Sequence, residues 1–341
     1  MHDRNPMPAS IKSQAPTYSV VVPCYNEEEN ILEFHKRISD VMNKTGESWE
    51  VVYVNDGSKD KTLEIVSVLS LEDTHVSYIN LSRNFGKEIA LTAGLDHAQA
   101  TDAIIIIDAD LQDPPEVITD LIAAKENVDT VYAQRRSRET DTFAKKFTAH
   151  LFYRLMERLG DKITIPPDTG DFRLISRRAL NALLEMREHH RFMKGLFAWI
   201  GFPSKAILYD RAPRHGGTTS FNYWKLWNFA LEGITSYTTV PLRITTYIGF
   251  FTACVAILYG CFIITKTLLF NNPVSGYPSL ITTILFIGGI QIAAIGIVGE
   301  YLGRIFNETK HRPLYFIEHL HQAQPTHQDN IPEENLPSLG S

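Results

Sequence analysis

Residues 104–115 read Ile-Ile-Ile-Ile-Asp-Ala-Asp-Leu-Gln-Asp-Pro-Pro, and this stretch decides the fold. Four consecutive isoleucines are typical of a central strand in a parallel sheet, because such a strand is buried on both faces. The run ends in carboxylates, and Pro114 and Pro115 prevent the strand from continuing. Ligands of open α/β sheets bind beyond the carboxyl ends of the strands. The stretch therefore predicts a rigid strand that carries Asp108 and Asp110 to a binding site.

Asp108, Asp110 and Gln112 follow one another at intervals of two residues. Oxygen ligands at this spacing suit one hard divalent cation, Mg²⁺ or Mn²⁺, that also contacts phosphate oxygens. The alternative is a strand end that carries solvated acids, and an isolated Asp-x-Asp does not decide between the two. The rest of the sequence has to supply the context.

Strands and helices alternate five times between residues 18 and 134, which predicts an α/β fold with a doubly wound, Rossmann-like, mainly parallel sheet. The expected strands are 18–22, 50–54, 76–81, 104–108 and 130–134. The later region is less regular, with expected helices at 143–159 and 176–186 and strands near 172–175 and 205–209.

Two apolar stretches, residues 244–270 and 279–301, are each long enough to cross a bilayer. The connector between them has no Lys or Arg, whereas Arg243 precedes the first stretch and Arg304 follows the second. By the positive-inside rule both ends face the cytoplasm. Residues 223–242 mix aromatic and apolar side chains, which suits an interfacial amphipathic helix and an ordinary core helix equally well.

The expected organisation has five parts: a disordered leader (1–17), a cytoplasmic domain (18–222), the amphipathic region (223–242), a two-span transmembrane hairpin (243–303) and a cytoplasmic tail (304–341) that is disordered after Phe316. The chain has 33 basic and 39 acidic residues, so its charge does not indicate nucleic acid as a partner. Three cysteines do not indicate a disulfide framework or a zinc site.

Four segments in order, residues 22–28, 54–60, 84–87 and 108–114, resemble the motifs of inverting glycosyltransferases of the GT-A type. Within that group the chain resembles the dolichol-phosphate mannose synthase-like, polyprenyl-phosphate branch, whose acceptor-site motif is similar to residues 170–177. The paired apolar stretches and residues 299–304 resemble the bacterial members that act on undecaprenyl phosphate. The sequence departs from the pattern at Asn55, where many members carry a second Asp.

The resemblance implies transfer of a sugar, with inversion, from a nucleotide sugar to polyprenyl (undecaprenyl) phosphate for cell-envelope or O-antigen modification. UDP-glucose is the first expectation for the donor, and UDP-N-acetylhexosamine, a UDP-aminoarabinose-type sugar and GDP-mannose stay open. The resemblance also implies a multi-pass protein of the bacterial inner membrane, with the catalytic domain facing the cytoplasm, and a homo-oligomer, for which it suggests a tetramer. A membrane-anchored scaffold that binds nucleotide sugars without catalysis is the alternative from another class.

Candidate residues follow for two sites, one for the nucleotide sugar and one for the acceptor phosphate. The nucleotide-sugar site would comprise Pro23, Tyr25, Glu27, Asp56, Lys87 and Asp108. Asp56 can accept a hydrogen bond from a pyrimidine N–H, or it can cap the following helix. Lys87 can neutralise a diphosphate, or it can be a solvated surface lysine.

The acceptor phosphate would be bound by Arg135, Arg138, Arg173, Arg177 and Arg214. These are candidates because guanidinium groups pair bidentately with phosphate. The resemblance offers Asp171 as the catalytic base. A phosphate monoester with a second pKa near ~6 is already ionised at neutral pH, so a positioning role for Asp171 is equally open.

Overall fold

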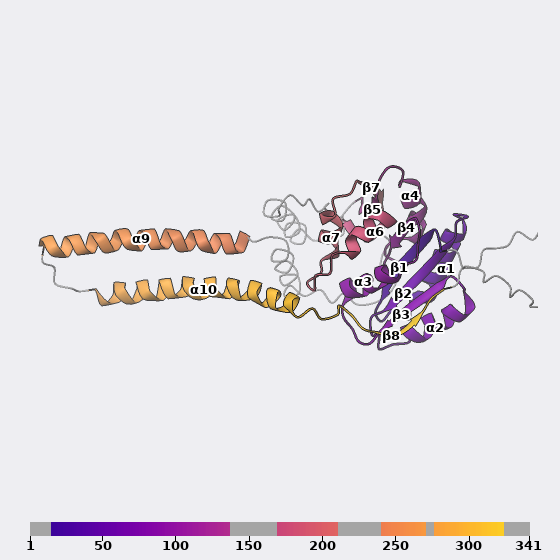
Figure 1. The fold of residues 1–341 in the computed structure, drawn as a ribbon, viewed down its shortest axis with the longest axis horizontal. Helices are drawn as coiled ribbons and strands as arrows, with labels where there is room; N and C mark the ends of the chain where they lie inside the picture. The colour runs from indigo at the N-terminus through magenta and orange to yellow at the C-terminus, as the bar shows by residue number, and fades with distance from the viewer. Residues whose placement is uncertain (1–14, 137–168, 211–239, 271–275, 324–341) are drawn as a thin grey trace, which may run out of the picture.

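The computed structural model describes residues 15–136, 169–210, 240–270 and 276–323 (Figure 1). The strands are β1 (Tyr18–Cys24), β2 (Trp49–Asn55), β3 (Val76–Leu81), β4 (Ala103–Ile106), β5 (Thr130–Arg135), β6 (Thr169–Ser176), β7 (Ser204–Tyr209) and β8 (Ile317–His321). The helices are α1 (Ile31–Asn43), α2 (Thr62–Glu72), α3 (Lys87–His97), the 3₁₀ turn η1 (Pro115–Val117), α4 (Ile118–Ala123), α6 (Arg177–Leu184), α7 (Met193–Trp199), α9 (Val240–Phe270) and α10 (Tyr277–Thr309). The helix expected at 143–159 and the amphipathic region at 223–239 lie outside the described residues, as do Arg138 and Arg214.

The eight strands form one mixed sheet in the order β7-β5-β6-β4-β1-β2-β3-β8. Its centre, β4-β1-β2-β3, is parallel throughout, which confirms the predicted fold class. β6 pairs antiparallel with both β4 and β5, and β7 is parallel to β5. Because β6 runs backwards, Arg173 lies opposite Ile106 at the carboxyl end of β4. The antiparallel strand therefore brings residues 170–173 next to Asp108.

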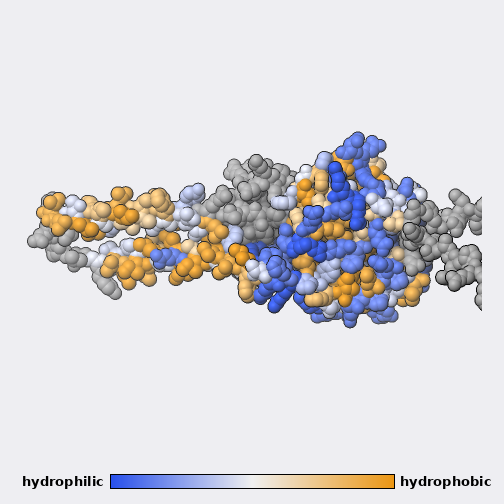
Figure 2. Space-filling model, viewed as in Figure 1, coloured by the Kyte–Doolittle hydropathy of each residue, from blue (hydrophilic) through white to orange (hydrophobic). Residues whose placement is uncertain are grey.

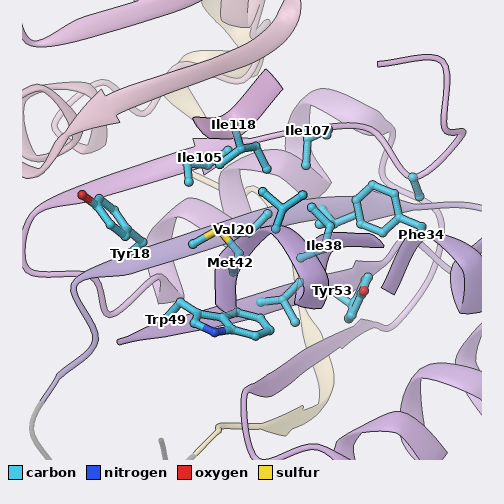
Figure 3. Packing of buried hydrophobic residues seen from close by; sticks show 14 of the residues in the cluster. Tyr18, Val20, Phe34, Ile38, Met42, Trp49, Tyr53, Ile105, Ile107 and Ile118 are labelled. Carbon is cyan, nitrogen blue, oxygen red and sulfur yellow. The ribbon is translucent and has the colours of Figure 1, made fainter. Parts of the chain in front are cut away.

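Helices cover both faces of the sheet and define two apolar layers. One layer packs α1, α2 and α4 against β1, β2 and β4; Figure 3 shows Phe34, Ile38 and Met42 of α1 against Val20 and Ile105. The other layer packs α3, α6 and α7 against the opposite face. A Cβ atom at Gly94 of α3 would lie 2.4 Å from Val21 Cγ1, so glycine lets α3 approach the sheet closely. These contacts fix the start of α3, where Lys87 lies, relative to β4.

α9 and α10 extend away from the sheet as a long helical pair, and apolar side chains cover much of their surface (Figures 1 and 2). Residues 244–266 and 279–309 are helices long and apolar enough to cross a membrane, and none of the most apolar part of either helix is buried inside the protein. α10 continues beyond the expected end at residue 301 to Thr309. In its last turns, Arg304 lies 3.2 Å from the Glu300 carboxylate and forms an ion pair with it, one turn apart along the helix.

The expected disorder after Phe316 is wrong for residues 317–323, because β8 forms there and pairs antiparallel with β3. Asn80 of β3 donates a side-chain hydrogen bond to Glu318 (2.8 Å), and the ring of Tyr78 stacks on that of His321. An edge strand gains main-chain hydrogen bonds on one side while its side chains stay half exposed, so a polar sequence can form one without a hydrophobic pattern.

Candidate active site

The loops after β1 and β2 are joined by reciprocal hydrogen bonds. Asn26, in the left-handed region at φ 56°, donates its N–H to Ser58 Oγ (3.0 Å) and accepts the Lys59 N–H at its Oδ1 (2.8 Å). Glu27 donates its N–H to Thr62 Oγ1 (2.8 Å), and its carboxylate accepts from Asn30 Nδ2 (2.7 Å). Glu27 therefore fixes the shape of the first loop, and its predicted contact with a nucleotide stays a prediction.

The same joined loops leave the Tyr25 side chain exposed at the carboxyl end of β1. Pro23 and Cys24 still belong to β1, so the strand continues two residues beyond its expected end at Val22. An exposed ring on a rigid loop can stack on a planar base. The structure therefore leaves Tyr25 available for the predicted nucleotide contact.

Asp56 connects the second loop to the third. Its carboxylate is almost fully buried and accepts the backbone N–H groups of Phe85 (2.7 Å) and Gly86 (2.9 Å). Burial raises the pKa of Asp56, and these two hydrogen bonds oppose the change. The neighbouring Gly57 has φ 65°, and a Cβ there would lie 2.6 Å from Asn84 N. Asp56 therefore holds the turn that precedes Lys87.

The alternative role of Asp56 as the cap of α2 is not what the structure shows. At the start of that helix, Asp60 Oδ1 accepts the N–H of Thr62 (3.0 Å). A contact between Asp56 and a nucleotide stays a prediction.

Lys87 joins two carboxylates at the carboxyl edge of the sheet. Its Nζ lies 2.7 Å from Asp108 Oδ2 and 2.7 Å from Asp171 Oδ2. Burial acts to lower the pKa of Lys87, but the two carboxylates outweigh it and raise the pKa well above its usual value. Burial raises the pKa of Asp108, the nearby Asp171 raises it further, and Lys87 opposes both. The Lys87 side chain is 43% exposed and pairs with two carboxylates, so it is the positive centre of a carboxylate cluster that solvent and ligands can reach. A contact between Lys87 and a diphosphate stays a prediction.

Asp171 is the most unusual member of this cluster. Its Oδ1 is buried and has no hydrogen-bond partner among the described residues. Burial acts to raise the pKa of Asp171, but Lys87 and Lys194 outweigh it and hold the pKa at about 2. A buried anionic oxygen without a donor is unfavourable unless a ligand completes it. The atom therefore marks a place where a bound group would supply a donor or a cation.

Arg173 contacts the backbone that carries Asp171. Its guanidinium donates to the carbonyl oxygens of Gly170 (3.0 Å) and Asp171 (3.2 Å), and its Cζ lies 3.8 Å from the ring centroid of Phe197. Burial lowers the pKa of Arg173 to about 10, so the side chain stays cationic at neutral pH. Arg173 thus supports the backbone of Asp171 in addition to bringing positive charge to the predicted acceptor site.

The Asp-x-Asp turn has a strained centre. Leu111 is buried in the left-handed region at φ 56°, and Gln112 donates its N–H to Asp110 Oδ1 (3.1 Å). A branched side chain in this region is uncommon and is often found at functional sites.

The donor set of Asp108, Asp110 and Gln112 fits a hard divalent cation, because all three can offer oxygen. Within the described ranges, no cluster of three or more His, Cys, Asp or Glu side chains is suited to a metal. Such an ion would therefore need further ligands from substrate or water, as Mg²⁺ commonly does.

The four predicted arginines other than Arg173 fall into three groups. Arg135 ends β5 at the carboxyl edge of the sheet, and its buried Nε has no partner among the described residues. The structure places Arg177 away from this edge: it follows Ser176, which pairs with Ala103 at the amino edge of β4, and its Nη1 donates to the Ala98 carbonyl (2.9 Å). Because β6 is antiparallel, four residues along the chain are enough to carry Arg177 to the opposite edge. Arg138 and Arg214 lie outside the described residues.

Sequence reasoning missed several residues of this site. Tyr209, at the end of β7, donates its hydroxyl to the buried Asp113 (2.5 Å), and Glu88 accepts the Met193 N–H (2.9 Å). Burial and Asp171 raise the pKa of Glu88 to about 7. Glu88 follows the quoted segment 84–87 and Asp113 lies within the quoted segment 108–114, so both could have been found there. Lys194 lies in the short helix α7, which the sequence pattern did not reveal.

Two parts of the chain match described families. Residues 19–184 match the family described as "Glycosyl transferase family 2", and residues 240–305 match the "GtrB C-terminal hairpin". The chain is 48% identical over 308 residues to a prophage-derived bactoprenol glucosyl transferase of Shigella flexneri, covering 90% of this chain and 99% of the relative. It is 49% identical to an uncharacterized glycosyltransferase of Synechocystis sp., covering 89% of this chain and 95% of the relative.

Among solved structures, glucosyl-3-phosphoglycerate synthase from Mycobacterium tuberculosis, in complex with Mn²⁺, UDP-glucose and phosphoglyceric acid, is similar with a TM-score of 0.45 and 20% identity. The match covers 64% of this chain and 78% of that one.

The extended sheet, the carboxylate cluster at its carboxyl edge and the apolar hairpin thus define a membrane-associated glycosyltransferase. The chain belongs to glycosyl transferase family 2, which confirms the resemblance seen in the motifs.

Proposed function

We propose that this protein transfers glucose from UDP-glucose to a polyprenyl phosphate, with inversion, giving a lipid-linked monosaccharide. The relatives named bactoprenol glucosyl transferase support the sugar and the lipid. The observation that carries the proposal is the Lys87 bridge between Asp108 and Asp171, beside the unpartnered Oδ1 of Asp171. This arrangement offers one cation and several anions where a phosphorylated donor and a phosphorylated acceptor would meet.

The donor side would be bound by the first three loops. Tyr25 would stack on the base, and Asp108, Asp110 and Gln112 would hold Mg²⁺ or Mn²⁺. The bound cation would supply positive charge against the diphosphate as the nucleoside diphosphate leaves. Lys87 would bind the same diphosphate, exchanging part of its contact with Asp108 for phosphate oxygens.

The acceptor side would be formed by Arg135, Asp171 and Arg173, with Arg138 and Arg214 as further predicted phosphate contacts. A general base works best when its pKa lies near the operating pH. With its pKa held at about 2, Asp171 is a weak base, and the acceptor phosphate is already ionised. Asp171 therefore acts by positioning the acceptor and its cationic neighbours, and the attacking oxygen comes from the phosphate itself.

The path of the chain supports a lipid acceptor. Residues 310–316 connect the end of α10 to β8, which begins opposite Leu81 at the carboxyl end of β3. The edge of the sheet that carries Asp108 is therefore the edge nearest the membrane helices. The phosphate of a polyprenyl lipid lies at the headgroup level of a bilayer, and tethering the site there raises its effective concentration.

The direct test uses purified full-length protein with undecaprenyl phosphate and a panel of radiolabelled donors: UDP-glucose, UDP-N-acetylglucosamine, a UDP-aminoarabinose-type sugar and GDP-mannose. We expect label in the lipid fraction from UDP-glucose, and none with the matched variant Asp110→Asn. Transfer from another donor alone would replace glucose in the proposal, and donor binding without any transfer would favour a non-catalytic scaffold.

We propose that the hairpin spans the bacterial inner membrane with both ends in the cytoplasm. The test is Gly276→Cys, between the two spans, in a chain whose Cys254 and Cys261 are serine. A membrane-impermeant thiol reagent added outside spheroplasts should label this variant and should not label the control Lys310→Cys. The reverse pattern would overturn the orientation.

A further inference from the structure

The end of α10 contacts the catalytic domain at the loop between α6 and α7, residues 185–192. Glu308 accepts the backbone N–H of His189 (2.8 Å) on one carboxylate oxygen, and its other oxygen lies 3.1 Å from His189 Nδ1. The second ring nitrogen of His189 lies 2.7 Å from the Arg312 carbonyl oxygen. Asn307 and His190 form a further side-chain contact at 3.2 Å. The last turn of the membrane helix therefore holds the loop by both backbone and side chain.

This loop leads directly into α7. Met193, the first residue of α7, donates its N–H to Glu88 (2.9 Å), which follows Lys87 in α3. Residues 189–193 are thus held at one end by the membrane helix and at the other by the helix that carries Lys87. Phe192 and Met193 are buried, so the segment between these contacts cannot move independently of the core.

α7 in turn supports the acceptor side of the site. The Phe197 ring packs against the guanidinium of Arg173, which holds the carbonyl oxygens of Gly170 and Asp171. A displacement of α7 would therefore change the placement of Asp171.

Of the other contacts of the C-terminal segment, that of Tyr315 reaches the start of this loop, because Asp96 also pairs with Arg187. Glu300 pairs with Arg304 inside α10, Tyr315 donates to Asp96 of α3, and Glu318 accepts from Asn80 of β3. Glu300 therefore provides a matched control on the same helix as Glu308.

We propose that Glu308 is a positioning residue for the acceptor side: through His189 it sets α7, and through α7 the Arg173–Asp171 pair. The membrane hairpin is then part of the architecture of the acceptor site as well as a tether. This inference rests on the proposed function for its kinetic consequence, but the mechanical link from Glu308 to α7 does not depend on which substrates are used.

The test compares wild type, Glu308→Ala and the control Glu300→Ala in the full chain. In Glu308→Ala we expect kcat/KM for undecaprenyl phosphate to fall by about tenfold, a size typical of coupling between sites, while KM for the nucleotide sugar and the melting temperature stay unchanged. Glu300→Ala should match wild type. Glu308→Gln keeps an acceptor oxygen for the His189 N–H and should retain more activity than Glu308→Ala.

A second readout is backbone hydrogen exchange followed by mass spectrometry, which needs no substrate. Exchange in residues 187–199 should be faster in Glu308→Ala, while exchange in α2 should not change. Unchanged exchange in 187–199, unchanged acceptor kinetics, or equal losses for donor and acceptor would each overturn the proposal. If wild type transfers no sugar, the proposed function fails, and the exchange measurement still decides whether Glu308 positions α7.

Discussion

The two edges of the central sheet both bury charge, but they treat it differently. At the amino edge, Glu50 is 1% exposed and accepts hydrogen bonds from Ser19 Oγ (2.5 Å), Gln99 N (2.7 Å) and Ser77 Oγ (3.2 Å). At the carboxyl edge, Asp171 Oδ1 and Arg135 Nε are buried and have no partner among the described residues.

The difference indicates that the charged cluster at the amino edge is structural and that the one at the carboxyl edge binds ligands. Burial raises the pKa of Glu50, and the hydrogen bonds from Ser19, Gln99 and Ser77 oppose the change, so the protein itself completes this group. A buried polar group that the protein does not complete carries a desolvation cost until a ligand binds. Substitutions at the amino edge should therefore change stability, and those at the carboxyl edge should change activity.

The largest effect is expected for Asp110→Asn. Removing one carboxylate from the predicted cation site should lower transfer on the order of 10³-fold, because the charge on the leaving diphosphate loses its stabilisation. The melting temperature and membrane association should stay as in wild type. Wild-type turnover in this variant, or undiminished wild-type transfer in excess EDTA, would remove the metal from the proposal.

Asp171→Asn should lower kcat/KM for the lipid acceptor by about 10²-fold, because a misplaced nucleophile is costly even when no proton has to be abstracted. The ratio of wild type to variant should stay constant between about pH 7 and 9, since the acceptor phosphate is ionised throughout. A ratio that converges toward one as the pH rises would restore Asp171 as a catalytic base.

Glu50→Ala should lower stability and leave activity unchanged. It leaves the Gln99 N–H and two hydroxyl groups without their acceptor, so the free energy of unfolding should fall by about 2 kcal/mol. Thermal unfolding measures this loss. The kcat per folded molecule should not change, and a selective loss of activity would contradict the division between the two edges.

At pH 4.5 the smallest effect is expected for Glu88→Gln, near the carboxyl edge, because this effect develops only as the pH rises. Glu88 faces Asp171, Lys87, Lys194 and the Met193 N–H, and its pKa is raised to about 7. Between about pH 4.5 and 7 the folded state keeps a proton that the unfolded state releases, so wild-type stability falls as the pH rises through this window.

Glutamine does not titrate and still accepts the Met193 N–H. The variant should therefore gain about 3 kcal/mol of stability on wild type between pH 4.5 and pH 8, the linkage expected when a pKa is raised from 4.5 to about 7. Melting temperatures of both proteins across this pH range provide the measurement. Parallel profiles for the two would show that Glu88 titrates normally.

The parallel half of this fold was predictable because its pattern is local. Runs such as residues 104–107 are apolar throughout, and both the buried strand and the carboxylates at its end follow from them. The spans were predictable for the same reason. β8 was missed because its residues carry no apolar pattern, and only pairing with a strand about 240 residues earlier makes them a strand.

Most residues of the site were predictable, but the direction of β6 was not. Residues 170–177 were assigned together, but the antiparallel β6 puts Asp171 and Arg173 at one edge and Arg177 at the other. Glu27 donates its N–H to Thr62, and Asp56 accepts the N–H of Phe85, so both hold loops through contacts with distant parts of the chain. Motifs show which residues share a site. They do not show which of those residues already form hydrogen bonds or ion pairs with one another.

β8 also has a consequence for biosynthesis. Its residues leave the ribosome after both apolar helices, whereas its partner β3 is made before most of the catalytic domain. Until the hairpin has been placed, the edge of β3 has no neighbour on that side, and open strand edges are prone to pair with other chains. The last strand can complete the sheet only when α10 ends beside it. Membrane insertion would then act as a checkpoint in folding: a chain whose hairpin fails to insert would keep an unfinished sheet, which cellular quality control can recognise.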